Sequence, residues 1–125
     1  MPFPTIPTAG AGRVLTTNQT GTSQTRTFPD LGSLTKNAGD LLIAVIVAYQ
    51  SSTTNAQFSS WGGGFTEFHD SGTGTTLAIG AAYKWSTGSE TGTFTVTQAA
   101  TVTGDASMML LSIPGAHLTT PPASR

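Results

Sequence analysis

The sequence predicts an all-β protein, folded as one antiparallel β-sandwich that is jelly-roll-like and has seven or eight strands. Apolar and polar residues alternate with a period of two in several stretches, as in strands that bury one face. Gly, Pro, Asn and Asp separate these stretches at short, regular spacing, which is typical of sandwiches and barrels. Only 9% of the residues are charged, against about 25% in ordinary soluble domains, and Thr, Ser and Gly take up the difference.

The 125 residues fit one domain, divided into an N-terminal arm (1–12), a sandwich (13–117) and a C-terminal tail (118–125). The arm is rich in Pro and Gly, and proline lacks the amide donor that pairing in a sheet interior requires. Two interpretations of the arm stay open. It is either a disordered terminus or an arm that orders against a neighbouring subunit, with Phe3 and Ile6 as its contact residues.

The first half of the chain contains three expected strands. Residues 13–17 and 24–28 form the first two, and a Pro-Asp pair then forces a turn. The longest apolar run, residues 41–49, follows a turn that ends at Asp40, and this carboxylate is expected to fix the start of the strand. Because its nine residues have no polar face, we expect this strand to be buried on both sides.

The second half contains the remaining strands. Residues 58–61 and 65–68 flank a run of three glycines, and a tight turn at 71–74 leads into residues 77–85. One face of that last stretch carries Leu77, Ile79, Ala81, Tyr83 and Trp85, and the other carries Ala78, Gly80, Ala82 and Lys84. We expect the larger face in the core and the smaller face against a neighbouring layer or subunit. Residues 93–97 and 107–113 complete the set.

Composition and charge exclude several classes of function. The net charge of −1 comes with no basic patch, so we expect no nucleic-acid partner. The absence of Cys excludes disulfides, thiol nucleophiles and cysteine-bound zinc. The longest apolar run is far shorter than the roughly 20 residues of a membrane helix, and the first residues lack the features of a signal peptide. We therefore expect a chain made in the cytoplasm, with no membrane partner.

Few residues could carry chemistry. Glu67, His69 and Asp70 form the one polar cluster that suggests catalysis or metal binding, but no nucleophile motif accompanies them. We interpret the cluster as a solvated strand end and predict no catalytic residue, no cofactor and no metal. Carboxylates in expected turns could instead bind Ca²⁺, although turn chemistry explains them without a metal. These carboxylates are Asp30, Asp40, Glu90 and Asp105.

Aromatic residues offer a second kind of site. A sugar-stacking platform could be built from Trp61, Trp85, Tyr49, Tyr83, Phe65 and Phe68. The alternative is core packing, which we favour for Tyr83 and Trp85 because they continue the face begun by Leu77. Trp61 stands beside three glycines and is expected to be exposed. Trp61 and Phe65 therefore join Phe3 and Ile6 as candidate partner-binding residues.

Four segments resemble a loose group of jelly-roll-like proteins from tailed phages and prophages: AGDLLIAV (38–45), FSSWGGGF (58–65), AYKWSTGSE (82–90) and LLSIPGA (110–116). The resemblance spans about residues 13–117 and its motifs are structural rather than catalytic. It implies a virion accessory protein, such as a capsid decoration protein, a head fibre or a tail-associated module. The partners it implies are the major capsid protein or other virion proteins.

These observations lead to a ranked set of functions. The first is a non-enzymatic virion structural protein that decorates a phage capsid as a homo-oligomer; a trimer would suit threefold capsid positions, although no residue specifies one. The alternative is a tail or fibre adhesin module that binds host-surface glycans. An enzyme or another soluble binding domain is the third possibility.

Overall fold

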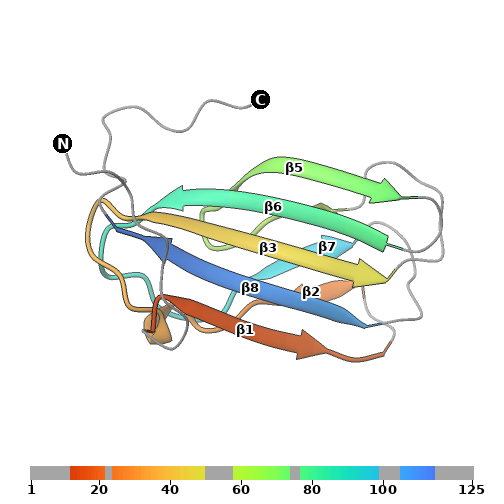
Figure 1. Cartoon of the computed structure of the whole chain (residues 1–125), viewed down its shortest axis with the longest axis horizontal. Coiled ribbons are helices and arrows are strands. Elements are labelled where there is room, and N and C mark those ends of the chain that lie inside the picture. The colour runs from red at the N-terminus through yellow and green to blue at the C-terminus, as the bar shows by residue number, and fades with distance from the viewer. Residues whose placement is uncertain (1–11, 22–23, 50–57, 74–76, 99–104, 115–125) are drawn as a thin grey trace.

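The described residues form a two-layer antiparallel β-sandwich of eight strands, as the sequence predicts (Figure 1). This computed structural model describes residues 12–21, 24–49, 58–73, 77–98 and 105–114. The expected arm residues Phe3 and Ile6 and the expected tail lie outside the described residues. No helix among the described residues has the length and apolar character needed to cross a membrane.

The larger sheet has five strands in the order β1-β8-β3-β6-β5. Its strands are β1 (Val14–Gln19), β3 (Leu41–Tyr49), β5 (Thr66–Thr73), β6 (Leu77–Trp85) and β8 (Ala106–Ile113). The smaller sheet has three strands in the order β2-β7-β4. They are β2 (Thr25–Thr27), β4 (Phe58–Ser59) and β7 (Thr95–Gln98), and a short 3-10 turn, η1 (Leu31–Ser33), precedes β3.

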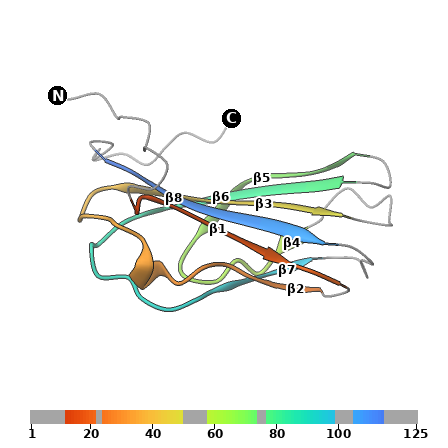
Figure 2. The ribbon, with the colours of Figure 1, turned by 60° about the horizontal axis from the view of Figure 1, so that its bottom comes forward.

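The chain repeatedly crosses between the two layers. It passes from β1 in the large sheet to β2 in the small one, back to β3, across to β4, and finally from β7 to β8 (Figures 1 and 2). Strand β8 then inserts between β1 and β3. This wrapping is that of a jelly roll, with β5 paired to β6 in the larger sheet.

Aromatic rings of the small sheet and its loops fill the space between the layers. Phe94 stacks on Phe28 and on Phe65, with ring centroids 4.7 and 4.6 Å apart. On the large sheet, β6 turns the small residues Ala78, Gly80 and Ala82 inward, which leaves room for the ring of Phe58, whereas β3 and β8 add larger aliphatic side chains to the core. The core comprises Phe28, Leu31, Leu34, Leu42, Ala44, Ile46, Ala48, Phe58, Phe65, Ala78, Ala82, Phe94, Val96, Ala106, Met108 and Leu110.

Gly80 shows how closely the layers approach. A Cβ atom built on Gly80 would lie 2.6 Å from Cδ2 of Phe58, well inside van der Waals contact. The small face of β6 therefore faces the core, and the larger face points outward. The expectation that Tyr83 and Trp85 pack in the core is wrong, because both lie on the outer face and are half-buried.

Strand β3 also departs from the expectation. Its even-numbered residues, such as Leu42 and Ile46, are fully buried. Its odd-numbered residues lie on the other face, where the exposed fraction reaches 37% at Val47 and 40% at Tyr49. The expectation of burial on both sides is thus wrong for this chain: the second face is apolar but open.

Polar side chains seal the ends of the sandwich. Asp40 Oδ2 accepts a hydrogen bond from the backbone N–H of Asn37 at 2.8 Å, and so closes the turn before β3 as expected. Arg13 forms an ion pair with the same oxygen at 2.8 Å, and its Nη1 also donates to Ser112 Oγ. This contact ties the start of β1 to the end of β8.

Two local features differ from the expected turns. Strand β5 continues through Thr73, so the expected tight turn at 71–74 begins inside a strand. A β-bulge lies between Glu67 and His69 in its pairing with β6. Before β5, Gly63 and Gly64 adopt positive φ angles of 66° and 78°, which explains why glycines occupy this turn.

Candidate interaction surface

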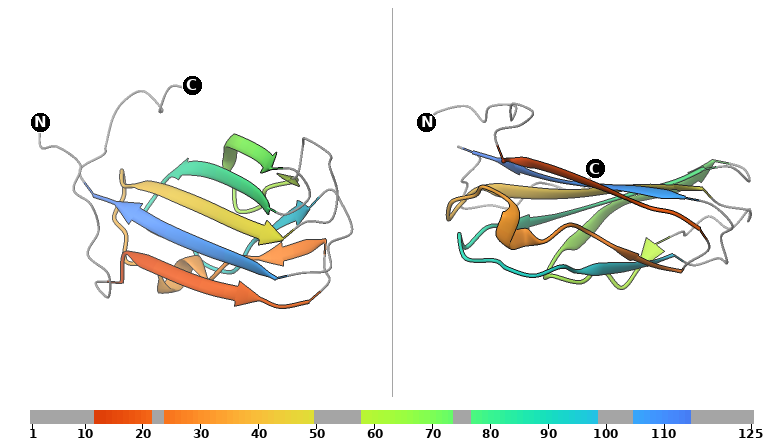
Figure 3. Two further views of the ribbon diagram at one scale, coloured as in Figure 1. Left: turned by 45° about the vertical axis from the view of Figure 1, so that its right-hand side comes forward. Right: turned by 90° about the horizontal axis from the view of Figure 1, so that it is seen from below.

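The candidate site is the outer face of the five-stranded sheet, the face that points away from β2, β4 and β7 (Figures 2 and 3). Register places the odd-numbered residues of β3, β6 and β8 side by side on this face; for example, Val45 pairs with Ala81 on one side and with Met109 on the other. The face carries Val14, Leu41, Ile43, Val45, Val47, Tyr49, Leu77, Ile79, Ala81, Tyr83, Trp85, Met109, Leu111 and Ile113.

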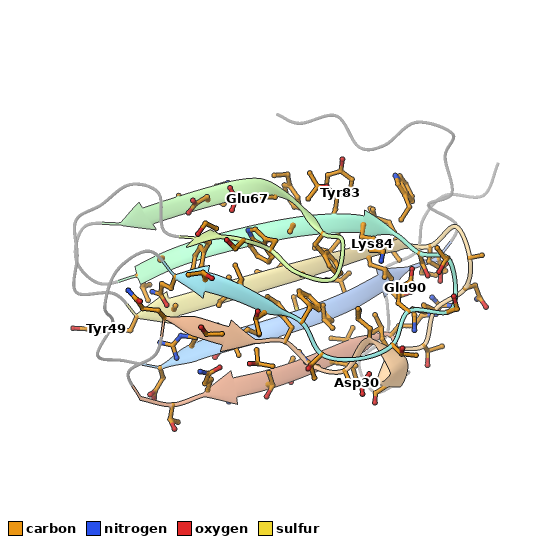
Figure 4. All side chains as sticks on the ribbon, turned by 180° about the vertical axis from the view of Figure 1, so that it is seen from behind. Asp30, Tyr49, Glu67, Tyr83, Lys84 and Glu90 are labelled. Carbon is orange, nitrogen blue, oxygen red and sulfur yellow. The ribbon has the colours of Figure 1, made fainter. Side chains whose placement is uncertain are left out.

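The outer face is open along the described strands. Leu77 is 42% exposed, and most of the central residues are half-buried, since neighbouring strands shield their flanks. Among the described residues, no strand or turn lies over this face (Figure 3). Tyr49 projects beyond the end of β3 (Figure 4).

No charged residue occupies an outward position on β1, β3, β6 or β8. The polar residues there are Thr16 and Asn18 on β1 and Ser107 on β8, which lie together at one corner of the sheet. Contiguous apolar patches of this kind are uncommon on monomers and mark interaction sites.

The opposite outer face, on the three-stranded sheet, provides an internal comparison. Its outward residues are Thr25, Thr27, Ser59, Thr95 and Thr97. Hydroxyl groups solvate such a face without charge. One outer face of the same sandwich is therefore suited to water and the other to contact with another surface.

Charged groups are used inside the fold instead. Arg26 is fully buried; its Nε donates to Gln98 Oε1 at 3.4 Å, and its Nη1 donates to the carbonyls of Gln19 and Gly21 at 3.4 Å. Burial lowers the pKa of Arg26, while the charge of Asp105 acts in the opposite direction.

Glu90 organises the crossover from β6 to β7. Its Oε1 accepts the Thr87 N–H at 2.6 Å, its Oε2 accepts the Ser86 hydroxyl at 3.0 Å, and Lys84 Nζ lies 3.8 Å away (Figure 4). Burial by itself would raise the pKa of Glu90, but the backbone and hydroxyl donors outweigh burial and lower it. The expectation of a hairpin-tip residue is wrong here, because this connection joins the two sheets and buries the carboxylate.

The structure separates the residues of the expected polar cluster. Glu67 Oε2 accepts a hydrogen bond from Trp61 Nε1 at 2.6 Å, His69 is paired with the Ser71 hydroxyl, and Asp70 Oδ2 accepts from the Phe58 N–H. Each side chain thus has a separate local partner. Among the described residues, no three His, Cys, Asp or Glu side chains are grouped as metal ligands would be.

The expected turn carboxylates also have structural roles. Asp30 Oδ1 accepts hydrogen bonds from the N–H groups of Gly32 and Gly92 at 2.6 and 2.9 Å, which links the turn before β3 to the turn before β7. Asp105 Oδ1 accepts from the Gly21 N–H at 3.0 Å. The local contacts of Asp30 with Gly32, of Asp40 with Asn37 and of Glu90 with Thr87 fit the interpretation as turn chemistry. Asp105 departs from it, because its hydrogen bond joins segments that are far apart in the chain.

The candidate aromatic residues divide into two groups. Phe65 is only 6% exposed and belongs to the core, so its side chain is not presented to a partner. Trp61 is half-buried rather than exposed, and packs against Phe28 and Phe58. By contrast, Phe68 is 42% exposed and contacts Tyr83, with ring centroids 6.2 Å apart.

Sequence reasoning missed the outer face because it assigned the apolar side of β6 to the core. The signal that could have found it was the alternation of Ala78, Gly80 and Ala82, since small residues fit against large rings. Comparison of the chain with protein-family models, curated proteins and solved structures finds no match in any of the three.

Proposed function

We propose that this chain is a non-enzymatic structural protein of a phage virion, which decorates the capsid by binding the lattice of the major capsid protein. The observation that supports a role in assembly is the broad, uncharged apolar face of the five-stranded sheet, which contrasts with the hydroxyl-rich outer face of the three-stranded sheet. The resemblance of four segments to phage accessory proteins supports the same role.

A decoration protein acts through contact area and repetition. Modest contacts repeated over many copies stabilise a shell by multivalency, without a reactive group at any of them. The described acidic side chains fit this role, because Asp30, Asp40, Asp105 and Glu90 each accept structural hydrogen bonds.

The terminal segments are the proposed contacts with the capsid. Val14 at the start of β1 pairs with Leu111 near the end of β8, so both segments leave the sandwich at the same end of the large sheet. Phe3 and Ile6 in the first segment supply apolar anchors of the kind that dominate protein interfaces.

Capsid binding tests this function directly. Purified empty capsids are mixed with increasing amounts of the protein, and bound protein is quantified after sedimentation. We expect saturable, stoichiometric uptake, and weaker uptake by a Phe3→Ala/Ile6→Ala double variant with an unchanged circular dichroism spectrum. No uptake by capsids of the phage that encodes the chain would refute capsid decoration.

The Phe68–Tyr83 pair favours a second candidate, an adhesin module that binds host-surface glycans. Exposed aromatic rings can stack on sugar rings, and Phe68 lies on the edge strand β5 where a glycan has access. Binding on a glycan array that is lost in Phe68→Ala and retained in Trp61→Phe would support this function. An array without signal would count against it.

A further inference from the structure

We propose that the outer face of the five-stranded sheet binds the same face of a second copy of this chain, giving a two-fold symmetric dimer. This inference rests on the proposed structural role and names the partner of the apolar face. Two apposed sheets would place their side chains in a new apolar layer, as in the interior of a β-sandwich. Because the contact is self-complementary, it closes as a pair.

Little apolar material in the rest of the given sequence matches the extent of this face. Outside the described residues, the sequence supplies few large apolar side chains, namely Met1, Phe3, Ile6, Val102 and Leu118. The outer face presents apolar residues along the full length of both β3 and β6. A surface of matching extent is therefore needed, and a second copy provides one.

Charge also favours a second copy. A face without Asp, Glu, Lys or Arg gives a charged partner nothing to recognise, whereas two copies bring no like charges together. The chain as a whole has a net charge of only −1, so long-range repulsion between copies is small.

The area of the face is sufficient for a stable dimer. The strands β1, β8, β3 and β6 have six, eight, nine and nine residues. At about 3.3 Å per residue and a strand spacing of about 4.8 Å, they outline roughly 500 Å². Two copies would then bury about 1,000 Å² in total, which reaches the lower limit for specific protein–protein interfaces.

Sedimentation velocity of the full chain over a range of concentrations tests the dimer. We expect a reversible dimer for the wild-type protein. Apart from Tyr49, Val47 and Leu77 are the most exposed apolar residues of β3 and β6. Val47→Lys and Leu77→Lys should each raise the dissociation constant of the dimer at least about 30-fold, since an ammonium group would lie unpaired in the contact.

Thr95→Lys is the matched control, because it adds the same charge to the hydroxyl-rich face. It should leave the dissociation constant unchanged. Circular dichroism and urea unfolding of all three variants establish whether they fold. If Val47→Lys does not fold, Leu77→Lys alone tests the contact.

Three results would overturn the proposal: a wild-type monomer at all concentrations, a wild-type trimer, or equal weakening by Thr95→Lys and Leu77→Lys. Capsid uptake is measured separately on the same samples. A dimer that does not bind capsids would refute the capsid function alone, and a monomer that binds them would refute the dimer alone.

Discussion

Arg26 occupies a position in β2 where a buried charge needs several acceptors. Its guanidinium contacts Gln98 Oε1 and the carbonyls of Gln19 and Gly21, which joins the end of β1 to both β2 and β7. A planar guanidinium can serve acceptors in several directions at once. This residue therefore fixes one end of the sandwich.

Arg26→Ala should destabilise the protein by about 2–4 kcal/mol, because it creates a cavity and leaves buried acceptors without a donor. Urea unfolding followed by tryptophan fluorescence measures the change. Arg26→Met is the control that keeps most of the side-chain volume and removes the donors. If Arg26→Met were as stable as the wild-type protein, the hydrogen bonds would contribute nothing.

Glu90 links stability to pH. Its pKa in the folded chain is lowered, so its contribution is present above the unfolded pKa of about 4.3 and is lost as the pH falls through the folded pKa. Glu90→Gln should therefore cost roughly 1–3 kcal/mol at pH 7 and much less in acid. Urea unfolding at pH 7 and pH 3 tests this, and a pH-independent difference would contradict it.

At the scale of elements, packing against the small sheet explains why the small residues of β6 face inward. The strand lies under the rings of the small sheet, and Phe58 occupies the space that a side chain at position 80 would need. Ala normally suits a strand better than Gly does, so local preference and packing make opposite predictions here.

Packing should decide the outcome. Gly80→Ala is expected to destabilise the protein by about 1–3 kcal/mol, because the Phe58 ring is held in the core and must move. A double variant that adds Phe58→Leu should lose less than the sum of the two single changes. Thermal unfolding of the four proteins completes the cycle, and additive losses would rule out this contact as the cause.

The two outer faces show the same principle for whole sheets. The outward-facing residues of the three-stranded sheet are Thr and Ser, whereas those of the five-stranded sheet include Val45, Ile79 and Leu111. Both sheets share one core, so core packing does not explain the difference. The proposed contact between two copies accounts for it.

At the scale of the whole molecule, the first and last strands of the sandwich are neighbours. Arg13 and Ser112, 99 residues apart in the chain, are joined by a hydrogen bond of 2.8 Å. The chain must close almost its full length before β1 can pair with β8.

This topology predicts slow folding. Sheets dominated by distant pairings fold in about milliseconds to seconds, whereas proteins with local contacts fold far faster. Stopped-flow dilution from urea, followed by tryptophan fluorescence, should show a main phase in that range. Complete refolding within microseconds would contradict the expectation that the distant β1–β8 pairing slows folding.

The sequence by itself determined the strands and most of the turns of this protein. Period-two alternation located β6 and β7, an unbroken apolar run located β3, and Asp40 marked the start of β3, because these signals depend on neighbouring residues alone. It did not determine which side of β3 or β6 faces the core. Alternation defines two faces, and when both are apolar only the shape of the opposite layer chooses between them.

The tertiary structure made that choice. The ring of Phe58 requires small residues opposite it, so Ala78, Gly80 and Ala82 turn inward, and Tyr83 turns outward with the rest of the larger face. The candidate interaction surface is the consequence. Its residues are visible in the sequence, but their exposure follows from packing between segments that are far apart in the chain.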